Sequence, residues 1–338
     1  MISMLLLEGS FVFLLSMTLI WVIRRYAPSM GLVDIPNERS SHTRIIPRGA
    51  GIGFTLAVLF HSLLFHSTLV SEHLYTFTAI VLVLIVGFLD DHKDTSPKTK
   101  FVVIILATLL VFMDGIKIDD IGTFFGYHLV LGWLALPFTV LAVVGFTNAL
   151  NLIDGLDGLA GGVSLVIFSA LFAVGYLNHD PFITTISFAF IVALAAFLVF
   201  NWNPASIFMG DSGSLVLGFV IALLAIKSLA YLPAVSILFL AAVPNMDVLI
   251  VLVRRKWHGR PVFSADKCHL HHILHQFFSY QTKNTVLFLI LLQAIYAITS
   301  LQLDKNIDEG WILILFVLNV MMLYMGLGAM IRRQKMDC

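Results

Sequence analysis

Charged side chains are scarce in this chain. Of its 338 residues, 20 are Lys or Arg and 20 are Asp or Glu, a charged share of 12%, which is about half the share usual in soluble domains. Hydrophobic residues make up 59% of the sequence, and the mean hydropathy is +0.97. So little polar material cannot cover a water-facing surface. This composition excludes a soluble enzyme, a disordered chain and a fibrous repeat.

Net charge and cysteine are lacking as well. The formal net charge is +0, so no overall basic field points to a nucleic-acid partner. The two cysteines, Cys268 and Cys338, form no paired metal motif and give no basis for a disulfide framework. The sequence therefore predicts a polytopic membrane protein, and its few polar residues become the informative ones.

Long apolar runs are what the sequence does have. A transmembrane helix needs roughly 17–25 mostly apolar residues, and eleven runs approach that length. We expect an all-α polytopic integral membrane protein with a single membrane domain over residues 1–338. The first run lacks a cleavage-site pattern and is interpreted as a retained anchor. The expected spans are 3–23, 50–70, 74–89, 99–114, 129–147, 159–177, 182–200, 213–229, 233–253, 285–302 and 311–331.

The basic residues orient these spans. Cytoplasmic loops of membrane proteins carry an excess of Lys and Arg. With the N-terminus outside, only Lys117, Lys227 and Lys305 fall on the outer side, which leaves 17 of the 20 basic residues inside. An odd number of spans then places the C-terminus in the cytoplasm. The cytoplasmic segments are predicted at 24–49, 90–98, 148–158, 201–212 and 254–284.

The ionisable residues gather in these inner segments. A transporter would place them near the bilayer midplane, on broken helices, whereas here they lie at the cytoplasmic ends of the spans. That distribution indicates chemistry at the membrane surface, between a water-soluble partner and a lipid. The active site is therefore expected in the cytoplasmic loops.

An acidic block ends the third span. Asp90, Asp91 and Asp94 place three carboxylates within five residues, and such hard oxygen ligands suit Mg²⁺, which in turn bridges phosphates. The alternative is a solvated helix end. On a helix Asp90 and Asp91 point about 100° apart, so we expect different tasks: Asp90 facing an acceptor phosphate, and Asp91 orienting the metal or a neighbouring lysine.

The next inner segment is rich in Asn, Asp and Gly. Asn148, Asn151, Asp154 and Asp157 are spaced three apart, which on a helical turn lines up one face. Their amides and carboxylates could hydrogen-bond a ribose or a base edge, or bind a metal, and the nearby glycines allow close backbone approach. The alternative is a polar interhelical loop.

The fourth inner segment runs from Asn201 to Ser214. Asp211 is expected where the eighth span starts, so a carboxylate and free backbone N–H groups would meet at a phosphate-binding helix terminus. The alternative, an ordinary helix N-cap, is compatible with that role. Phe208 could offer a face for base stacking, or be an ordinary interfacial aromatic.

The last inner loop contains a histidine cluster that includes His269, His271 and His272. It could bind a transition metal or hydrogen-bond sugar and phosphate groups. The Arg254–Lys256 run is explained most simply as a positive-inside anchor. Asp247, inside the ninth span, is a functional candidate because it is an intramembrane acid, but the sequence offers it no partner.

Taken together, these blocks resemble the polyprenyl-phosphate N-acetylhexosamine-1-phosphate transferases, and most closely the bacterial branch that transfers GlcNAc-1-phosphate to undecaprenyl phosphate. The resemblance runs from about Asp34 to His275 and rests on five blocks in the family's order. They are Arg39–His42 continuing through Pro47–Gly51, Asp90–Asp94, Asn148–Gly158, Asn201–Gly213 and His269–His272. Ala50 is a small departure, because the family often has Gly there.

The resemblance implies a Mg²⁺-dependent transferase, with Mn²⁺ as a substitute, that moves HexNAc-1-phosphate from a UDP-sugar to undecaprenyl phosphate and releases UMP. It implies a multi-pass protein of the bacterial inner membrane that starts a lipid-linked surface glycan, with no nucleic-acid partner. A homodimer is left open. By resemblance, the catalytic residues are Asp90, Asp91, Asp211 and His271; the metal ligands are Asp211 and Asn151; and the substrate-binding residues are Asn148, Asp154, Asp157, Asn201, Phe208, Lys100, His42, Arg44, His269 and His272.

Three other classes were weighed against this one. The CDP-alcohol phosphotransferases carry an Ala-Arg after their Gly pair, which is absent from Asp154–Gly161. Membrane prenyltransferases use two Asp-rich motifs, whereas the second block here is mixed Asn, Asp and Gly. A transporter disagrees with the placement of the ionisable residues. The branch that transfers a muramoyl-pentapeptide has a longer His run containing a proline, so His-Leu-His-His disfavours it. The identity of the UDP-HexNAc and the glycan pathway stay open.

Overall fold

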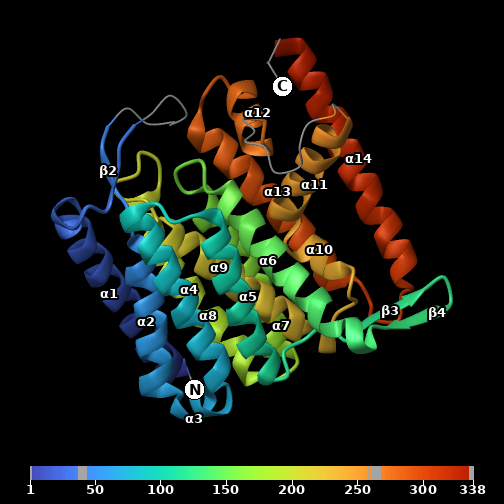
Figure 1. Cartoon of the computed structure of the whole chain (residues 1–338), viewed down its shortest axis with the longest axis horizontal. Coiled ribbons are helices and arrows are strands. Elements are labelled where there is room, and N and C mark those ends of the chain that lie inside the picture. The colour runs from blue at the N-terminus through green and yellow to red at the C-terminus, as the bar shows by residue number, and fades with distance from the viewer. Residues whose placement is uncertain (1, 37–43, 258, 260–267, 335–338) are drawn as a thin grey trace.

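The computed structural model describes residues 2–36, 44–257, 259 and 268–334. The chain is a bundle of α-helices with two small antiparallel strand pairs (Figure 1). The helices are α1 (Ile2–Tyr26), α2 (Ala50–Phe65), α3 (Ser67–Glu72), α4 (Leu74–Lys93), α5 (Pro97–Met113), α6 (Ala135–Ile153), α7 (Leu159–Leu177), α8 (Pro181–Asn201), α9 (Asp211–Lys227), α10 (Ser236–Leu240), α11 (Ala242–Trp257), α12 (Leu270–Phe277), α13 (Thr282–Gln302) and α14 (Glu309–Gln334). The strands β1 (Val33–Asp34) and β2 (Ile46–Pro47) form one pair, and β3 (Asp120–Phe124) and β4 (Tyr127–Val130) form the other.

Within the described residues, eight helical segments are long and apolar enough to cross a membrane, and α2 is a shorter apolar helix. The prediction of a polytopic α-helical membrane protein is therefore confirmed, while the count of eleven spans is not. Several predicted boundaries were wrong. The span expected at 50–70 is α2 followed, after a break at His66, by α3, and the span expected from 129 begins at Ala135, because residues 127–130 form β4.

The span predicted at 233–253 is divided into α10 and α11 by a break at Ala241. Pro244 lacks the N–H that would bond to the carbonyl of Leu240 in a continuous helix. The side chain of Gln293 on α13 fills the gap, because its amide donates to the Leu240 carbonyl at 2.8 Å and accepts from Val243 N–H at 3.0 Å. The break therefore leaves neither backbone group unpaired inside the bundle.

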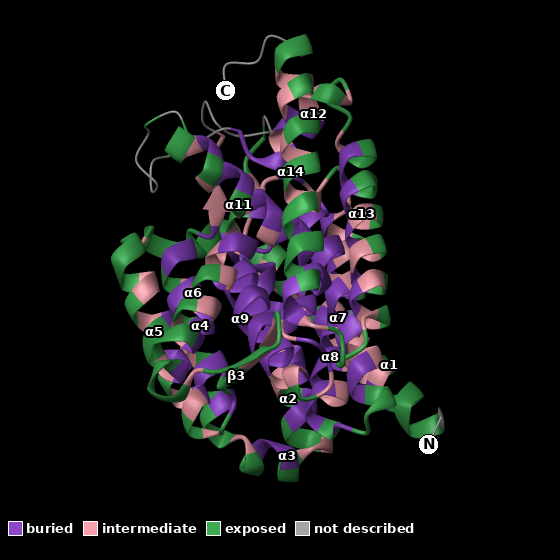
Figure 2. Cartoon of the chain, turned by 90° about the vertical axis from the view of Figure 1, so that its right-hand side faces the viewer, coloured by how far each residue is buried: buried purple, intermediate pink, exposed green. Residues whose placement is uncertain are grey.

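Helix α9 lies at the centre of the bundle, where Figure 2 shows it almost wholly buried. Its residues from Ser212 to Ile226 are all buried, and a helix that is apolar all round belongs in such a position. It packs against α6, α4, α2 and α7. Helix α14, in contrast, lies at the periphery with many exposed apolar side chains, as expected of a surface that faces lipid.

The two ends of the bundle differ. The links between α4 and α5, α6 and α7, and α8 and α9 lie at one end together with β1, β2 and α12, whereas α3 and the β3–β4 hairpin lie at the other (Figure 1). The first residues of α1 and the last residues of α14 lie at opposite ends of the molecule in both views. The polar blocks of the sequence lie at the end of the bundle that carries the α4–α5, α6–α7 and α8–α9 links.

Candidate active site

Asp90, Lys100 and Asp211 form an ion-pair network that joins three helices. The Lys100 ammonium lies 2.7 Å from Asp211 Oδ2 and 3.2 Å from Asp90 Oδ2. Asp90 Oδ1 also accepts a hydrogen bond from the Thr95 hydroxyl at 2.7 Å. Asp211 begins α9, Asp90 lies near the end of α4, and Lys100 is in the first turn of α5. The network therefore fixes the positions of these helix ends relative to one another.

The adjacent Asp91 carboxylate caps helix α9. Its Oδ1 accepts from the backbone N–H of Asp211 at 2.8 Å, and its Oδ2 accepts from the N–H of Ser212 at 3.1 Å. Gly210, at the N-cap position, has φ 72° and supplies no side chain. A Cβ at Gly210 would meet both Asp91 oxygens at 2.4 Å. Asp91 thus takes the role of an N-cap residue from another helix.

Two glycines let α9 approach its neighbours this closely. A Cβ on Gly51 of α2 would lie 2.1 Å from the Gly213 nitrogen, and one on Gly87 of α4 would lie 2.5 Å from the Ser212 Cα. Both contacts are with backbone, which cannot swing away as a side chain can. The first turn of α9 therefore packs directly against the backbone of α2 at Gly51 and of α4 at Gly87.

Asn151 connects α6 to the same centre. Its side-chain amide donates to Asp211 Oδ1 at 3.1 Å and to the Ser214 hydroxyl at 2.8 Å. Asn148 lies one turn earlier on α6 and is half-buried. The predicted helical alignment of these two residues is confirmed, whereas Asp154 and Asp157 lie beyond the last residue of α6, Ile153.

Asp154 lies in the link between α6 and α7 and faces other acids. Burial, followed by the negative charges of Asp211, Asp91 and Asp157, raises the pKa of Asp154 to about 7. A carboxyl group shifted in this way reports a local excess of negative charge in a poorly solvated place. Lys100 is the cation that the described structure places among these carboxylates.

Asp157 and Asn201 hold two loops together. Asp157 Oδ2 accepts from the side-chain amide of Asn203 at 2.9 Å. Asn201, which is buried, accepts from the N–H of Gly158 and donates to the carbonyl of Ile207, both at 2.9 Å. In this structure both residues therefore position the link between α8 and α9, in addition to any contact with substrate.

Phe208 connects this loop to the first sequence block. Its N–H donates to the Pro47 carbonyl at 2.8 Å, and its own carbonyl accepts from Ala50 N–H at 3.1 Å. The Phe208 side chain is half-buried and Arg44 is exposed. Two blocks far apart in the sequence are thus brought together, although His42 lies outside the described residues.

The histidine cluster lies on α12 at the same end of the bundle. Asp247 is paired with His269: its Oδ2 lies 2.7 Å from His269 Nδ1, and its Oδ1 accepts from the next backbone N–H. The His271 ring covers the backbone of Gly155, where a Cβ would lie 2.4 Å from His271 Nε2. Burial and the neighbouring histidines lower the pKa of His271 well below its usual value, so this imidazole is neutral. His272 beside it is half-buried.

Sequence reasoning did not single out some residues of this centre. Thr95 bonds to Asp90, and Ser214 bonds to Asn151. Thr95 directly follows the Asp90–Asp94 block and Ser214 ends the Asn201–Ser214 segment, so proximity in sequence was the available signal. Asp247 was noted as an intramembrane acid, but its partner is 22 residues away. The structure also pairs the neighbouring lysine with Asp90, where Asp91 was one expectation.

Fold and site together define a class of protein. Carboxylate oxygens and a side-chain amide converge at one end of a membrane bundle with a lysine, neutral and carboxylate-paired imidazoles, and a helix N-terminus. Helix N-termini of this kind bind phosphates, and carboxylates are ligands that hard divalent cations accept. This is the arrangement expected of a membrane-embedded phosphotransferase.

Comparison with known proteins narrows the class. The family model described as glycosyl transferase family 4 matches residues 73–229. A probable undecaprenyl-phosphate N-acetylglucosaminyl 1-phosphate transferase of Bacillus subtilis (strain 168) is 33% identical over 89% of this chain and 85% of its own length. An undecaprenyl-phosphate alpha-N-acetylglucosaminyl 1-phosphate transferase of Yersinia pestis is 34% identical over 79% and 76%, and one of Salmonella typhi is 30% identical over 91% and 86%. The chain belongs to this transferase family, as its sequence blocks predicted.

Proposed function

We propose that this protein transfers N-acetylglucosamine-1-phosphate from a UDP-sugar to undecaprenyl phosphate and releases UMP, starting a lipid-linked surface glycan. The names of the relatives support the acceptor and the transferred group. The observation that carries the proposal is the network in which Lys100 joins Asp90 to Asp211 while Asn151 bonds the other oxygen of Asp211. This network lies at a bundle end, where a soluble nucleotide and a lipid headgroup can meet.

The residues of the site fit a magnesium ion. Asp211 would hold it through a carboxylate oxygen and Asn151 through its amide oxygen, because both are hard ligands. The Asn151 amide, whose nitrogen here donates to Asp211 Oδ1, would turn over to bind the ion. The raised pKa of Asp154 agrees with the assignment, since burial and, after it, the negative charges of Asp211, Asp91 and Asp157 raise it. When bound, Mg²⁺ or a substituting Mn²⁺ neutralises diphosphate charge and stabilises the leaving UMP.

The protein's own groups then have distinct tasks. The acceptor is a phosphate monoester with a second pKa of about 6, so near neutral pH it needs little deprotonation. Asp90, held by Thr95 and Lys100, either accepts the residual proton or positions the acceptor electrostatically. The neutral His271 can hydrogen-bond the sugar or diphosphate without adding charge. Phe208 offers the uracil a face for stacking.

An apolar cavity suits the tail of the lipid acceptor. Its volume is about 370 Å³, and it lies between α6, α9 and α10. Apolar side chains make up most of its wall, among them Phe138, Leu141, Phe146, Ile221 and Leu238. Phe146 lies within two turns of Asn148 and Asn151 on α6, so a tail in this cavity could lead its phosphate toward the polar centre.

We place the protein in the bacterial inner membrane with eleven spans, its N-terminus outside and its active site in the cytoplasm. The eight long helices supply part of this count. Helices α2, α5 and the broken pair α10–α11 would supply the other three, since each packs against one of the long helices. The excess of basic residues at the end that carries the active site supports the orientation.

The test is UMP release by the purified protein in detergent with undecaprenyl phosphate, Mg²⁺ and a panel of UDP-sugars. We expect release to require the lipid and to be fastest with UDP-GlcNAc among UDP-GlcNAc, UDP-GalNAc and UDP-muramoyl-pentapeptide. Release of UMP without the lipid acceptor would contradict the proposal. Fastest release with the pentapeptide donor would move the protein to another branch.

A further inference from the structure

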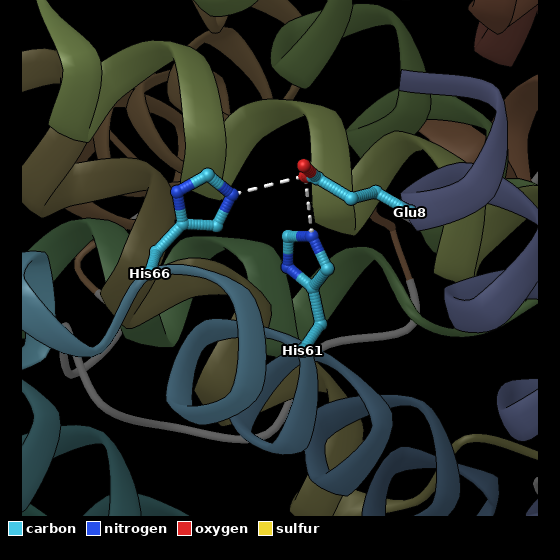
Figure 3. A group of neighbouring side chains, drawn as sticks. All are labelled: Glu8, His61 and His66. Atoms are coloured by element: carbon cyan, nitrogen blue, oxygen red, sulfur yellow. Dashed lines mark hydrogen bonds and ion pairs between the residues drawn. The ribbon is translucent and has the colours of Figure 1, made fainter. Parts of the chain in front are cut away.

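A second cluster of ionisable residues lies far from the active site, near the end of the bundle that carries α3. Glu8 of α1 points toward His61 of α2 and toward His66, which follows α2 (Figure 3). Both histidine Nε2 atoms approach the same carboxylate oxygen, Glu8 Oε2, at 3.0 Å and 2.9 Å. The ligand atoms of the three residues all lie within 4.8 Å of one another.

The chain conformation brings the two histidines together. Residues five apart on a continuous helix point about 140° away from each other, so His61 and His66 would not share a partner there. The break between α2 and α3 occurs at His66, with φ −135° and ψ 44°, and it turns the His66 ring back toward Glu8. Glu8 is the one acid in the sequence of α1, and an acid within an apolar span is a functional candidate.

We propose that Glu8, His61 and His66 form a binding site for a first-row transition-metal ion, with Zn²⁺ as the principal candidate. Two imidazoles and one carboxylate are a ligand set that zinc accepts, with a fourth position left for water. Ligand atoms at about 2.0–2.1 Å from a tetrahedral ion stand about 3.4 Å apart. The present separations of 2.9 and 3.0 Å need to open by only a few tenths of an ångström.

The surroundings suit an ion that enters from one side. The His61 side chain is 0% exposed and that of Glu8 is 10% exposed, whereas that of His66 is 29% exposed and reaches the molecular surface. Phe65 lies against the site, with its ring 5.5 Å from that of His61. His61 Nδ1 has no hydrogen-bond partner in the described structure, so the site lacks the outer acceptor that strengthens metal-bound histidines. We therefore expect weaker binding than at catalytic zinc centres.

The experiment uses the full-length protein in detergent, stripped with a chelator and returned to saturating Mg²⁺ so that hard-cation sites are filled. Co²⁺ is the probe, because its visible absorption reports nitrogen and oxygen ligands, and Zn²⁺ is then added to displace it. The variants are Glu8→Gln and His66→Gln. His128→Gln is the matched control, since His128 is an exposed histidine at the same end that pairs with Asp120.

Wild type and His128→Gln should bind one more equivalent of Co²⁺, displaceable by Zn²⁺, than either site variant. Any binding by the histidines of α12 contributes equally to all four proteins and cancels in this difference. Zn²⁺ should also raise the melting temperature of wild type and His128→Gln by more than that of either site variant. Equal stoichiometry and equal spectra in all four proteins would overturn the proposal and leave a hydrogen-bonded link between α1 and α2. If Glu8→Gln does not fold, the partly exposed His66→Gln decides the question.

Discussion

Asp90 and Asp91 are neighbours in the chain, but their carboxylates contact different partners. Asp90 contacts a lysine and a threonine hydroxyl, and Asp91 contacts the backbone at the start of α9. Asp211, which accepts neither of those backbone N–H groups, is left with Lys100 and Asn151. Two of the three acids thus face the polar centre, and the third maintains the helix end on which that centre depends.

These different contacts predict different effects for two matched substitutions, one on transfer activity and one on thermal stability. Asp211→Asn should abolish transfer at ordinary Mg²⁺ concentrations while the α9 cap supplied by Asp91 stays in place, because it removes a hard anionic ligand and the ion pair with Lys100 but no cap. Asp91→Asn should lower the melting temperature, because an amide cannot accept both N–H bonds and lost caps cost about 0.5–2 kcal/mol. Activity and thermal unfolding of both purified variants provide the check. Near-normal turnover of Asp211→Asn with unchanged Mg²⁺ dependence would refute the ligand role.

Asp154 predicts a pH dependence of stability in the absence of divalent cations. Its pKa of about 7 in the fold exceeds the ordinary value of 3.8, so the folded state binds the proton more tightly than the unfolded state. The stabilisation is present below pH 3.8 and is lost as the pH rises through about 7. Melting temperatures in chelator from pH 5 to 8 should therefore fall more steeply for wild type than for Asp154→Asn. Parallel slopes for the two proteins would contradict this assignment.

At the scale of the elements, the close packing of α9 against α2 and α4 determines the position of Asp211. Gly87→Ala would place a methyl carbon 2.5 Å from the Ser212 Cα, so α9 must shift and carry Asp211 with it. We expect at least a tenfold loss of kcat/KM, since small misplacements of reacting groups can cost about 100-fold. Gly326→Ala on α14 is the control, because nothing lies within 4 Å of that Cβ position. Comparable activity of both variants would show that the contact between α4 and α9 accommodates a methyl group at position 87.

The elements also show which features a sequence can reveal. Apolar runs located most helices, and the spacing of Asn148 and Asn151 placed both on one helix, as observed. The β3–β4 hairpin was missed, because Leu129 and Val130 of β4 merge with the apolar run that follows. Lys100 and Asp211 are 111 residues apart, and no local pattern signals such a pairing.

Some features depended on packing alone. The cap on α9 comes from Asp91, 120 residues earlier. The close packing of that helix depends on Gly51 and Gly87. A glycine in an apolar run does not reveal which backbone will approach it. The five ordered blocks nevertheless identified the family before any geometry was known, because five blocks in a fixed order are far more specific than any one of them.

At the scale of the whole molecule, the active-site end and the hairpin end of the bundle are predicted to face opposite sides of the membrane. Reporter fusions placed after Arg333 and within the 114–128 segment should report opposite sides of the membrane, with the first in the cytoplasm. The C-terminal end of α14 and the β3–β4 hairpin lie at opposite ends of the bundle (Figure 1), and the basic residues favour the active-site end as cytoplasmic. A C-terminus found outside would put the active loops on the face that UDP-sugars do not reach.

The most direct test of the central claim follows a single phosphorus atom. UDP-GlcNAc labelled with ³²P in the phosphate that carries the sugar is incubated with undecaprenyl phosphate, Mg²⁺ and the purified protein, with Asp211→Asn as the inactive control. The account predicts that the label moves to the lipid and that the nucleotide leaves as unlabelled UMP, because the diphosphate is cleaved between its two phosphates. Label that stays with the nucleotide and leaves as UDP would show transfer of the sugar alone, and would contradict the account.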